Sequence, residues 1–334
     1  MSETIRGVTE SGLFEVEVED YHQDPCPTPS LSNSLLKPLL AQSPQHAFQA
    51  SSRLNPKFEP SGNDRFDLGS AVHMLALEKG RALQVIEADD YRTTKAKEAR
   101  DAARALGKIP ILAEKYETAL AMASSIRRGL RDFPGAEAAL DLSRGKTEIG
   151  LFWEDEAGCW GRNLIDRLIT DEPMWTIFDL KTIARSARPD DPSLGTHFVD
   201  MGYDTQAAMQ ERGLCRVFPE LSGRLQFRFV FVELDPPHML SVVEPDAATM
   251  TIARKKVARG FELWAECLRT RQFPGYPRKI VSLRSPEWLA NRWLEREIAE
   301  EQEKQAGNDP RKDYDRAADL EAREARMQTL LDAG

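Results

Sequence analysis

The sequence predicts a mixed α/β fold, in which a central β-sheet is flanked by helices. Residues 147–182 have the alternation and the short apolar runs of three successive strands, and 224–233 and 240–244 have those of two more. Residues 109–140 and 247–270 instead repeat apolar positions with the period of an amphipathic helix, and a Phe-Pro-Gly turn interrupts the first of them near its end. Strands and helices therefore alternate along one chain.

Length and composition indicate one domain with a tail. A chain of 334 residues with 41% hydrophobic and 30% charged residues can bury a large core. We expect a catalytic domain over 1–285, with a helical part at 30–140 and the catalytic sheet at 147–245. Residues 286–334 are charged and helical in pattern, with an interruption near 307–310, and predict a peripheral tail. The net charge of −9 disfavours nucleic acid only weakly, because it describes the whole chain and not one cleft.

The four cysteines lie far apart, without the short spacings of zinc or iron–sulfur sites, so free thiols in a reducing compartment are expected. The N-terminus has no apolar core of a signal peptide, and no stretch approaches the roughly 18 apolar residues of a membrane span. These features predict a cytoplasmic protein without a membrane partner.

The N-terminal region predicts one strand and two capped helices. Residues 14–18 alternate as a short strand. Ser32 and Ser34 precede an apolar helix as caps, and Ser43-Pro44 starts a second one. Two readings stay open for Ser32 and Ser34, which either cap the helix or line a site.

The apolar helix over 69–77 contains one histidine, His73, with Gly69 on the same face four residues earlier. A lone histidine on an apolar helix is usually a core residue, so its value as a ligand depends on what it faces. Residues 91–108 are basic. They form either a solvated helix face or a flank that contacts DNA phosphates.

The segment 147–182 gathers acids and one lysine. Asp179 and Lys181 alternate with Leu180 and so share one face of a strand. A neighbouring strand can bring Asp166 beside Asp179. If the hairpin turn centres near Ala157, Glu148 lies across from Asp166. Carboxylates that hold divalent cations, next to an amine that handles a water proton or a phosphate, are what a metal-dependent phosphodiesterase needs.

The remaining elements flank this segment. Residues 183–202 predict a polar loop, in which Arg185 and Arg188 could meet phosphates. A helix over 203–212 follows, with Gln206 and Gln210 one turn apart, and it could lie over the end of the Asp179 strand. Phe227, Phe229 and Phe231 share one face of the next strand.

Ordered motifs then indicate a family. SLSNSLLKPLLAQSPQHAF, DLGSAVHMLAL, TEIGLFW, GRNLIDRL, FDLKT, YDTQAAM and FPGYP follow one another over residues 20–285. In this order the chain resembles the RecE-type exonucleases (exodeoxyribonuclease VIII) of the PD-(D/E)XK, RecB-like nuclease superfamily, which is encoded by bacteria and phages. The resemblance implies a mixed sheet flanked by helices and an Mg²⁺-dependent site, with Mn²⁺ as a possible substitute.

The resemblance also implies residue roles. Lys181 is the expected catalytic lysine, acting with Asp166 and Asp179. The expected metal ligands are His73, Asp166, Asp179, the Leu180 backbone carbonyl and, with less support, Glu148. Residues expected at the DNA are Gln206, Tyr203, Arg185, Arg188, Arg162, Ser32 and Ser34. The family's QxxxY motif has Gln210 where tyrosine is usual, and Tyr203 on the preceding turn could replace it.

The implied function is hydrolysis of linear double-stranded DNA, from 5′ to 3′, in phage-type recombination. A ring-shaped homo-oligomer and a single-strand annealing protein are the implied partners, besides the DNA ends. Two alternatives stay open: an endonuclease or single-strand nuclease on the same core, and a catalytically idle DNA-binding or recombination module.

Overall fold

The computed structural model describes residues 7–59, 64–307, 318–326 and 328. The chain divides into two compact units, Met1–Tyr276 and Pro277–Gly334. The sequence-based boundary at residue 285 stays a prediction. The described helices include none with both the length and the apolar character needed to cross a bilayer.

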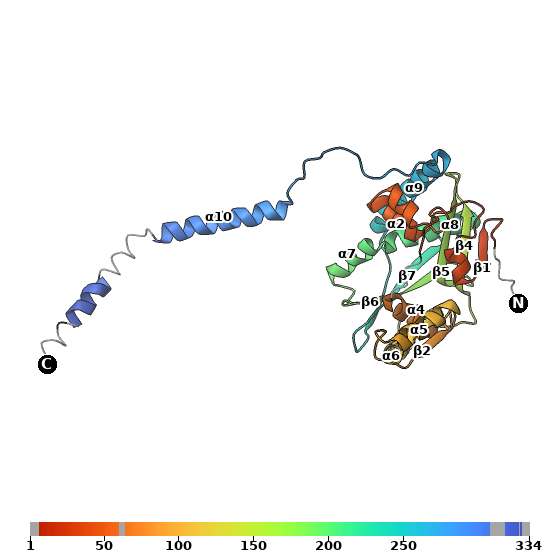
Figure 1. Ribbon diagram of the computed structural model, residues 1–334, viewed down its shortest axis with the longest axis horizontal. Coiled ribbons are helices and arrows are strands. Elements are labelled where there is room, and N and C mark those ends of the chain that lie inside the picture. The colour runs from red at the N-terminus through yellow and green to blue at the C-terminus, as the bar shows by residue number, and fades with distance from the viewer. Residues whose placement is uncertain (1–6, 60–63, 308–317, 327, 329–334) are drawn as a thin grey trace. The chain divides into compact units, whose positions relative to one another are not determined.

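The first unit is built around a six-stranded sheet in the order β1-β4-β5-β6-β7-β8 (Figure 1). Its strands are β1 (Gly12–Glu15), β4 (Lys146–Glu154), β5 (Trp160–Ile169), β6 (Trp175–Ile183), β7 (Leu225–Glu233) and β8 (Leu240–Val243). Only β6 and β7 pair in parallel, and the other neighbours are antiparallel. With helices on both faces, this confirms the expected mixed fold.

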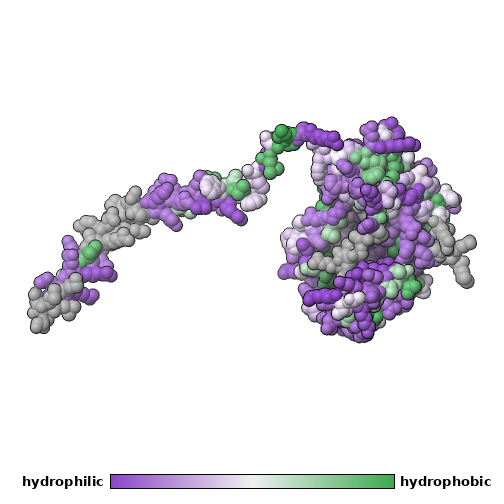
Figure 2. Space-filling view, viewed as in Figure 1, coloured by the Kyte–Doolittle hydropathy of each residue, from purple (hydrophilic) through white to green (hydrophobic). Residues whose placement is uncertain are grey.

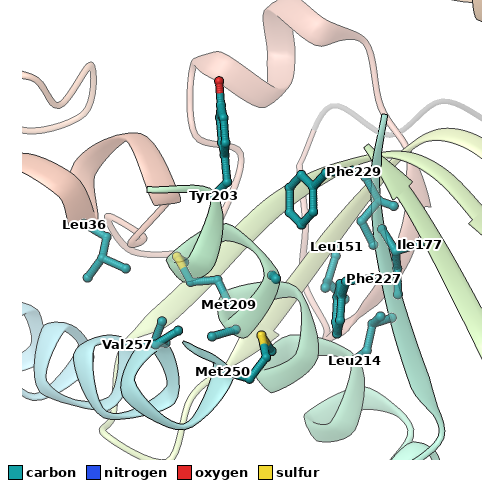
Figure 3. Close-up of a cluster of buried hydrophobic side chains, with 14 of the residues drawn as sticks. Leu36, Leu151, Ile177, Tyr203, Met209, Leu214, Phe227, Phe229, Met250 and Val257 are labelled. Atoms are coloured by element: carbon teal, nitrogen blue, oxygen red, sulfur yellow. The ribbon is translucent and has the colours of Figure 1, made fainter. Parts of the chain in front are cut away.

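Helices cover one face of the sheet with a large apolar core. They are α2 (Asn33–Ala41), α3 (Pro44–Gln49), α7 (Pro192–Met201), α8 (Tyr203–Val217) and α9 (Ala247–Thr270). Phe227, Phe229 and Phe231 all belong to this core, as their shared strand face predicts. Outside, the visible surface of the first unit is mostly hydrophilic (Figure 2). Figure 3 shows Met209 and Leu214 of α8 in the same apolar cluster as Phe227 of β7 and Leu151 of β4, so α8 packs against the sheet.

Two glycines allow the helices of this face to approach closely. A Cβ at Gly213 of α8 would lie 2.6 Å from the ring of Trp153 on β4. A Cβ at Gly260 of α9 would overlap the side chain of Leu36 on α2. Since buried side chains have little room to move, only glycine fits at these crossings.

The opposite face is covered by α4 (Asp64–Leu77) and α6 (Ala113–Arg131), which pack on Phe178, Leu180 and Val230. Next to them lies a small parallel sheet of β2 (Leu83–Ile86) and β3 (Ile109–Leu112), with α5 (Thr94–Ala105). The sequence-based helix over 109–140 is therefore wrong at its start, because residues 109–112 pair with β2. The interruption expected at the Phe-Pro-Gly turn near its end is confirmed, since α6 stops at Arg131 and a 3₁₀ turn (Glu137–Ala139) follows the turn.

Two more local expectations need correction. The polar loop expected over 183–202 contains α7, which Asp191 caps by accepting a hydrogen bond from the Ser193 backbone N–H at 2.8 Å. The N-terminal strand is β1, which ends at Glu15, and residues Val18–His22 form α1 rather than extending it. Ser32 precedes α2 as expected, but its side chain makes no capping hydrogen bond.

The β4–β5 hairpin has the expected register. The partners Thr147–Arg167 and Ile149–Ile165 centre the turn on Ala157, and Glu148 and Asp166 occupy the facing positions between these two pairs. Asp155 fixes this turn by accepting hydrogen bonds from the Ala157 backbone N–H at 3.0 Å and from the Trp153 indole at 3.2 Å. The hairpin thus brings two acids of the candidate site together.

The described part of the second unit contains α10 (Glu287–Gly307) and a helical stretch at 318–326. The break expected near residues 307–310 lies mostly outside the described residues.

Candidate active site

The site is centred on Asp179, in the middle of β6. Its side chain is 2% exposed, and Oδ1 forms an ion pair with Nζ of Lys181, two residues along the same strand face. Oδ2 accepts a hydrogen bond from the amide of Gln206 on α8. Helix α8, which follows α7, therefore lies at this acid, as expected for the helix that begins at Tyr203. The Asp179 carboxylate is held from two sides.

Asp166 of β5 and His73 of α4 meet at the backbone of Leu180. The Leu180 N–H donates to Oδ2 of Asp166 at 3.0 Å, and the Leu180 carbonyl accepts from Nε2 of His73 at 2.7 Å. Nδ1 of His73 lies 3.6 Å from Oδ2 of Asp166. Gly69, one turn before His73, leaves space that Thr182 fills, because a Cβ on Gly69 would lie 3.4 Å from its Oγ1. His73 thus faces an acid, and not only apolar side chains.

Burial and nearby charges set the pKa values of Asp179 and Lys181. Burial, together with the nearby carboxylate of Asp166, raises the pKa of Asp179 to about 6, although Lys181 opposes the shift. Burial alone would lower the pKa of Lys181, but the carboxylates of Asp179 and Asp166 raise it above its ordinary value. The single positive charge of Lys181 does not fully compensate the two carboxylates of Asp166 and Asp179 in this largely buried site.

The donor set fits a hard divalent cation. Asp166, Asp179 and the Leu180 carbonyl offer oxygen atoms, which Mg²⁺ and Mn²⁺ prefer, and His73 adds an imidazole nitrogen that suits Mn²⁺. Among the described residues, no three His, Cys, Asp or Glu side chains are already grouped as a closed metal site. His73 and Asp166 instead bond to the Leu180 backbone, and Asp179 bonds to Lys181 and Gln206.

Glu148 stands at the edge of the site with an unusual backbone. Its φ is 46°, in the left-handed region, although it lies within β4. Burial and the Asp166 carboxylate raise its pKa. Its carboxylate packs against Gly80, where a Cβ would lie 3.1 Å from Oε1. Backbone strain of this kind is held in place by the surrounding fold and is common at functional sites.

An aromatic cluster surrounds Lys181. The Tyr203 ring lies 5.1 Å from Nζ of Lys181, stacks on Phe229 with centroids 5.9 Å apart, and meets the Phe198 ring edge-on. Burial raises the pKa of Tyr203, which is 9% exposed. Tyr203, for which a contact with DNA is expected, thus packs beside Lys181.

Gln210 points into the core. It is fully buried and donates to the side chain of Asn163 on β5 at 3.2 Å. Gln206, one turn earlier, is therefore the glutamine of α8 that reaches the acids. The position at which the family motif has tyrosine and this chain has Gln210 is therefore buried.

Several residues expected at the DNA have structural partners. Arg162 is 5% exposed and pairs with Asp24 at 3.0 Å. The hydroxyls of Ser32 and Ser34 lie 2.9 Å apart, with Ser32 buried and Ser34 exposed.

Two arginines lie on the exposed loop before α7. Arg185 donates to the Ser193 carbonyl at 3.3 Å, and Arg188 pairs with Asp190 at 2.6 Å. The loop follows directly on β6, which ends two residues after Lys181. Both side chains are thus on the surface of the first unit, close in sequence to Lys181.

Sequence reasoning did not find the residues that fix the start of α8. Asn33 of α2 donates to the Gly202 carbonyl at 3.2 Å and accepts from Thr205 at 3.0 Å. This clamp holds the turn that carries Tyr203 and Gln206. Its only sequence signal is Gly202, whose φ of 77° is in the left-handed region and which directly precedes α8.

The family follows from a comparison of the whole sequence. The model of a PDDEXK-like domain of unknown function (DUF3799) matches residues 32–286, which is most of the chain. The chain belongs to this PDDEXK-like family. The match includes every side chain of the site, and it confirms the PD-(D/E)XK resemblance that the motifs indicate and supports a nuclease.

Other comparisons add only distant likenesses. No curated protein matches the chain. A crystal structure of a candidate exonuclease from Eubacterium rectale shares 13% identity at a TM-score of 0.49, covering 80% of this chain and 97% of that one. The alkaline exonuclease LHK-Exo from Laribacter hongkongensis shares 15% identity at a TM-score of 0.23, covering 63% and 97%.

Proposed function

We propose that this PDDEXK-like protein is a metal-dependent exonuclease that hydrolyses phosphodiester bonds of linear double-stranded DNA. The observation that carries the proposal is the meeting of Asp166, Asp179 and Lys181 with His73 at the backbone of Leu180. Digestion from 5′ to 3′, a role in phage-type recombination, a cytoplasmic location, a ring-shaped homo-oligomer and an annealing partner belong to the same proposal through the RecE-type motifs.

The residues divide the chemistry between them. Asp166, Asp179, the Leu180 carbonyl and His73 would hold Mg²⁺ or Mn²⁺, with Glu148 nearby. When bound, the cation neutralises phosphate charge and acidifies a water molecule. With a bound cation offsetting the carboxylates that raise its pKa, Lys181 would orient that water or accept its proton, and Gln206 and Tyr203 would keep Asp179 and Lys181 in place. Attack on phosphorus breaks the P–O3′ bond, which leaves a 5′-phosphate and a 3′-hydroxyl.

The decisive assay is digestion of linear duplex DNA labelled at either the 5′ or the 3′ end, with Mg²⁺, Mn²⁺ or EDTA. We expect cation-dependent release of label from the 5′ end first. Asp179→Asn and Lys181→Ala should each lower the rate roughly 100-fold or more, because each removes a group that acts at the reacting phosphate. Glu262→Gln, which removes an exposed acid of α9, is the matched control and should digest normally.

Four outcomes decide between the proposal and its alternatives. Undiminished digestion by both site variants would falsify the proposal. Nicking of a covalently closed circle would identify an endonuclease, and a preference for single strands would identify a single-strand nuclease. An idle DNA-binding module would digest no DNA. In calorimetry it would also show no Mn²⁺ binding that is lost in the Asp166→Ala variant.

A further inference from the structure

The first turn of α8 has no side-chain cap of its own. Gly202 occupies its N-cap position with φ 77° and has no side chain that could accept a hydrogen bond from the turn. Contacts with neighbouring elements therefore decide where the side chains of this turn point. Two of them, Tyr203 and Gln206, reach the lysine and the central acid of β6. The site thus depends on how this turn is held.

Asp204 belongs to the same turn and contacts another helix. Its Oδ2 accepts a hydrogen bond from Nζ of Lys256 on α9 at 2.8 Å. Thr205, the next residue, is bonded to Asn33 of α2. Because successive side chains of a helix point about 100° apart, four consecutive residues of this turn contact three different elements, β6, α9 and α2.

The ion pair joins a buried acid to a half-buried base. The Asp204 side chain is 2% exposed and that of Lys256 is 36% exposed. Oδ1 of Asp204 is buried and accepts no hydrogen bond from the residues that the structure describes. Lys256 and the N-terminal end of the helix dipole therefore compensate this charge. Without the ammonium group, the carboxylate keeps its charge only if the turn moves toward water.

Helix α9 holds Lys256 at a fixed position. The next residue, Val257, packs in the large apolar core that also contains Met209 of α8 (Figure 3). The same helix touches α2 at Gly260, where no Cβ would fit. Since α9 is packed on both α8 and α2, its lysine can fix the place of Asp204.

We propose that Lys256 is a positioning residue for hydrolysis, which acts on the site through Asp204 and the first turn of α8. Its ion pair is with Asp204, so its effect on the reacting groups is indirect. While the ion pair is intact, the turn presents Gln206 and Tyr203 to β6. This inference rests on the proposed nuclease function.

Steady-state digestion of linear duplex DNA with Mg²⁺ tests the proposal. Lys256→Met keeps most of the apolar stem of the side chain and removes its charge. We expect kcat to fall about tenfold while KM for DNA stays within about twofold of the wild type, because the turn shifts and misplaces groups at the reacting phosphate. Lys256→Arg keeps a cation that can donate to Asp204 and should retain kcat within about threefold.

Two further variants identify the route of the effect. Lys255→Met removes the same charge from the exposed neighbouring position of α9 and should digest as the wild type does. Asp204→Asn in the Lys256→Met chain leaves no unpaired charge buried, so this double variant should recover most of the lost kcat.

Three results overturn the proposal. The first is an unchanged kcat in Lys256→Met. The second is an equal loss of kcat with and without Asp204→Asn, which would show that Lys256 does not act through this acid. The third is an unchanged kcat with a raised KM that grows further with salt, because Lys256 would then contact DNA phosphates instead.

Hydrogen exchange distinguishes a failure of this inference from a failure of the nuclease proposal. Backbone amides of residues 203–210 should exchange about tenfold faster in Lys256→Met and return toward the wild-type rate in the double variant, since the turn opens more often without its support. Lys255→Met should exchange as the wild type does. If the wild type digests DNA but neither kcat nor exchange responds to Lys256→Met, only the positioning role is overturned. If the wild type digests no DNA, the nuclease proposal falls, and exchange decides whether Lys256 holds the turn.

Discussion

At the scale of single residues, the site depends on where a few polar side chains are buried. Asp179 is nearly inaccessible, yet it touches both Lys181 and Gln206. A buried carboxylate keeps its charge only if such partners compensate the lost hydration. The neighbours of these acids therefore matter as much as the acids.

Tyr203 is the neighbour with the clearest expected effect. Its ring lies beside Lys181, where a cation–π contact is worth roughly 1–2 kcal/mol when partly desolvated. Tyr203→Leu should lower kcat about tenfold and leave KM for DNA nearly unchanged, as steady-state digestion would measure. Tyr203→Phe keeps the ring and should retain kcat. A raised KM in Tyr203→Phe would instead show that the hydroxyl contacts DNA.

Glu148 is expected to lower the stability of the fold while it contributes to digestion. Its left-handed φ of 46° costs roughly 1–3 kcal/mol in a residue with a Cβ, and its raised pKa shows that burial disfavours the charged form. Glu148→Gly should therefore raise the free energy of unfolding by about 1 kcal/mol and reduce digestion.

Glu148→Gln separates charge from strain. Because the folded-state pKa is raised, the stabilising effect of the protonated acid is lost as pH rises through that value. Glu148→Gln, which stays neutral, should be more stable than the wild type at pH 8 and nearly equal to it at pH 4. Urea unfolding at both values measures this. Equal stability at pH 8 would contradict the prediction.

At the scale of elements, α8 is the part on which the site relies. It lies against the sheet through Gly213, is clamped to α2 at Thr205, and delivers Gln206 to Asp179. Arg212 fastens it to the β4–β5 turn by two hydrogen bonds to Asp155, at 2.6 and 2.9 Å. Helix and hairpin are thereby joined at the turn of the hairpin.

Removing the Asp155 anchor should loosen both elements. Burial alone would raise the pKa of Asp155, but its hydrogen bonds, from Arg212 foremost, hold the pKa below the ordinary value. Its contribution is thus fully present above about pH 4 and is lost as pH falls through the lowered pKa. Asp155→Asn should cost about 2 kcal/mol of unfolding free energy at pH 7 and clearly less near pH 3.

The matched control for Asp155 lies on the same helix. Glu211→Gln breaks the exposed pair with Arg254 and should cost under about 1 kcal/mol. Equal losses in Asp155→Asn and Glu211→Gln would show that the turn anchor has no special role.

At the scale of the whole molecule, the division at Tyr276 separates the site from the tail. All the acids, Lys181 and His73 lie in the first unit, as do the three apolar cores. A chain that ends at Tyr276 should therefore digest DNA, if the nuclease proposal holds, at a rate within about twofold of the full chain at low protein concentration. Loss of digestion with an unchanged thermal transition would contradict this prediction.

The sequence by itself predicted the fold class, the strands that carry the site and the hairpin register. These are local properties, since side chains alternate with a period of two along strands such as 160–169 and with 3.6 along helices such as 247–270. The aligned acids of β5 and β6 followed from that alternation.

The tertiary structure alone decided which polar side chains are buried and what they touch. Arg162 pairs with Asp24, Gln210 with Asn163, and Tyr203 packs beside Lys181. Each pair joins residues from different elements, so no periodicity within one segment can predict it. The short strands β2 and β3 were missed for the same reason, because four residues become a strand only through a distant partner.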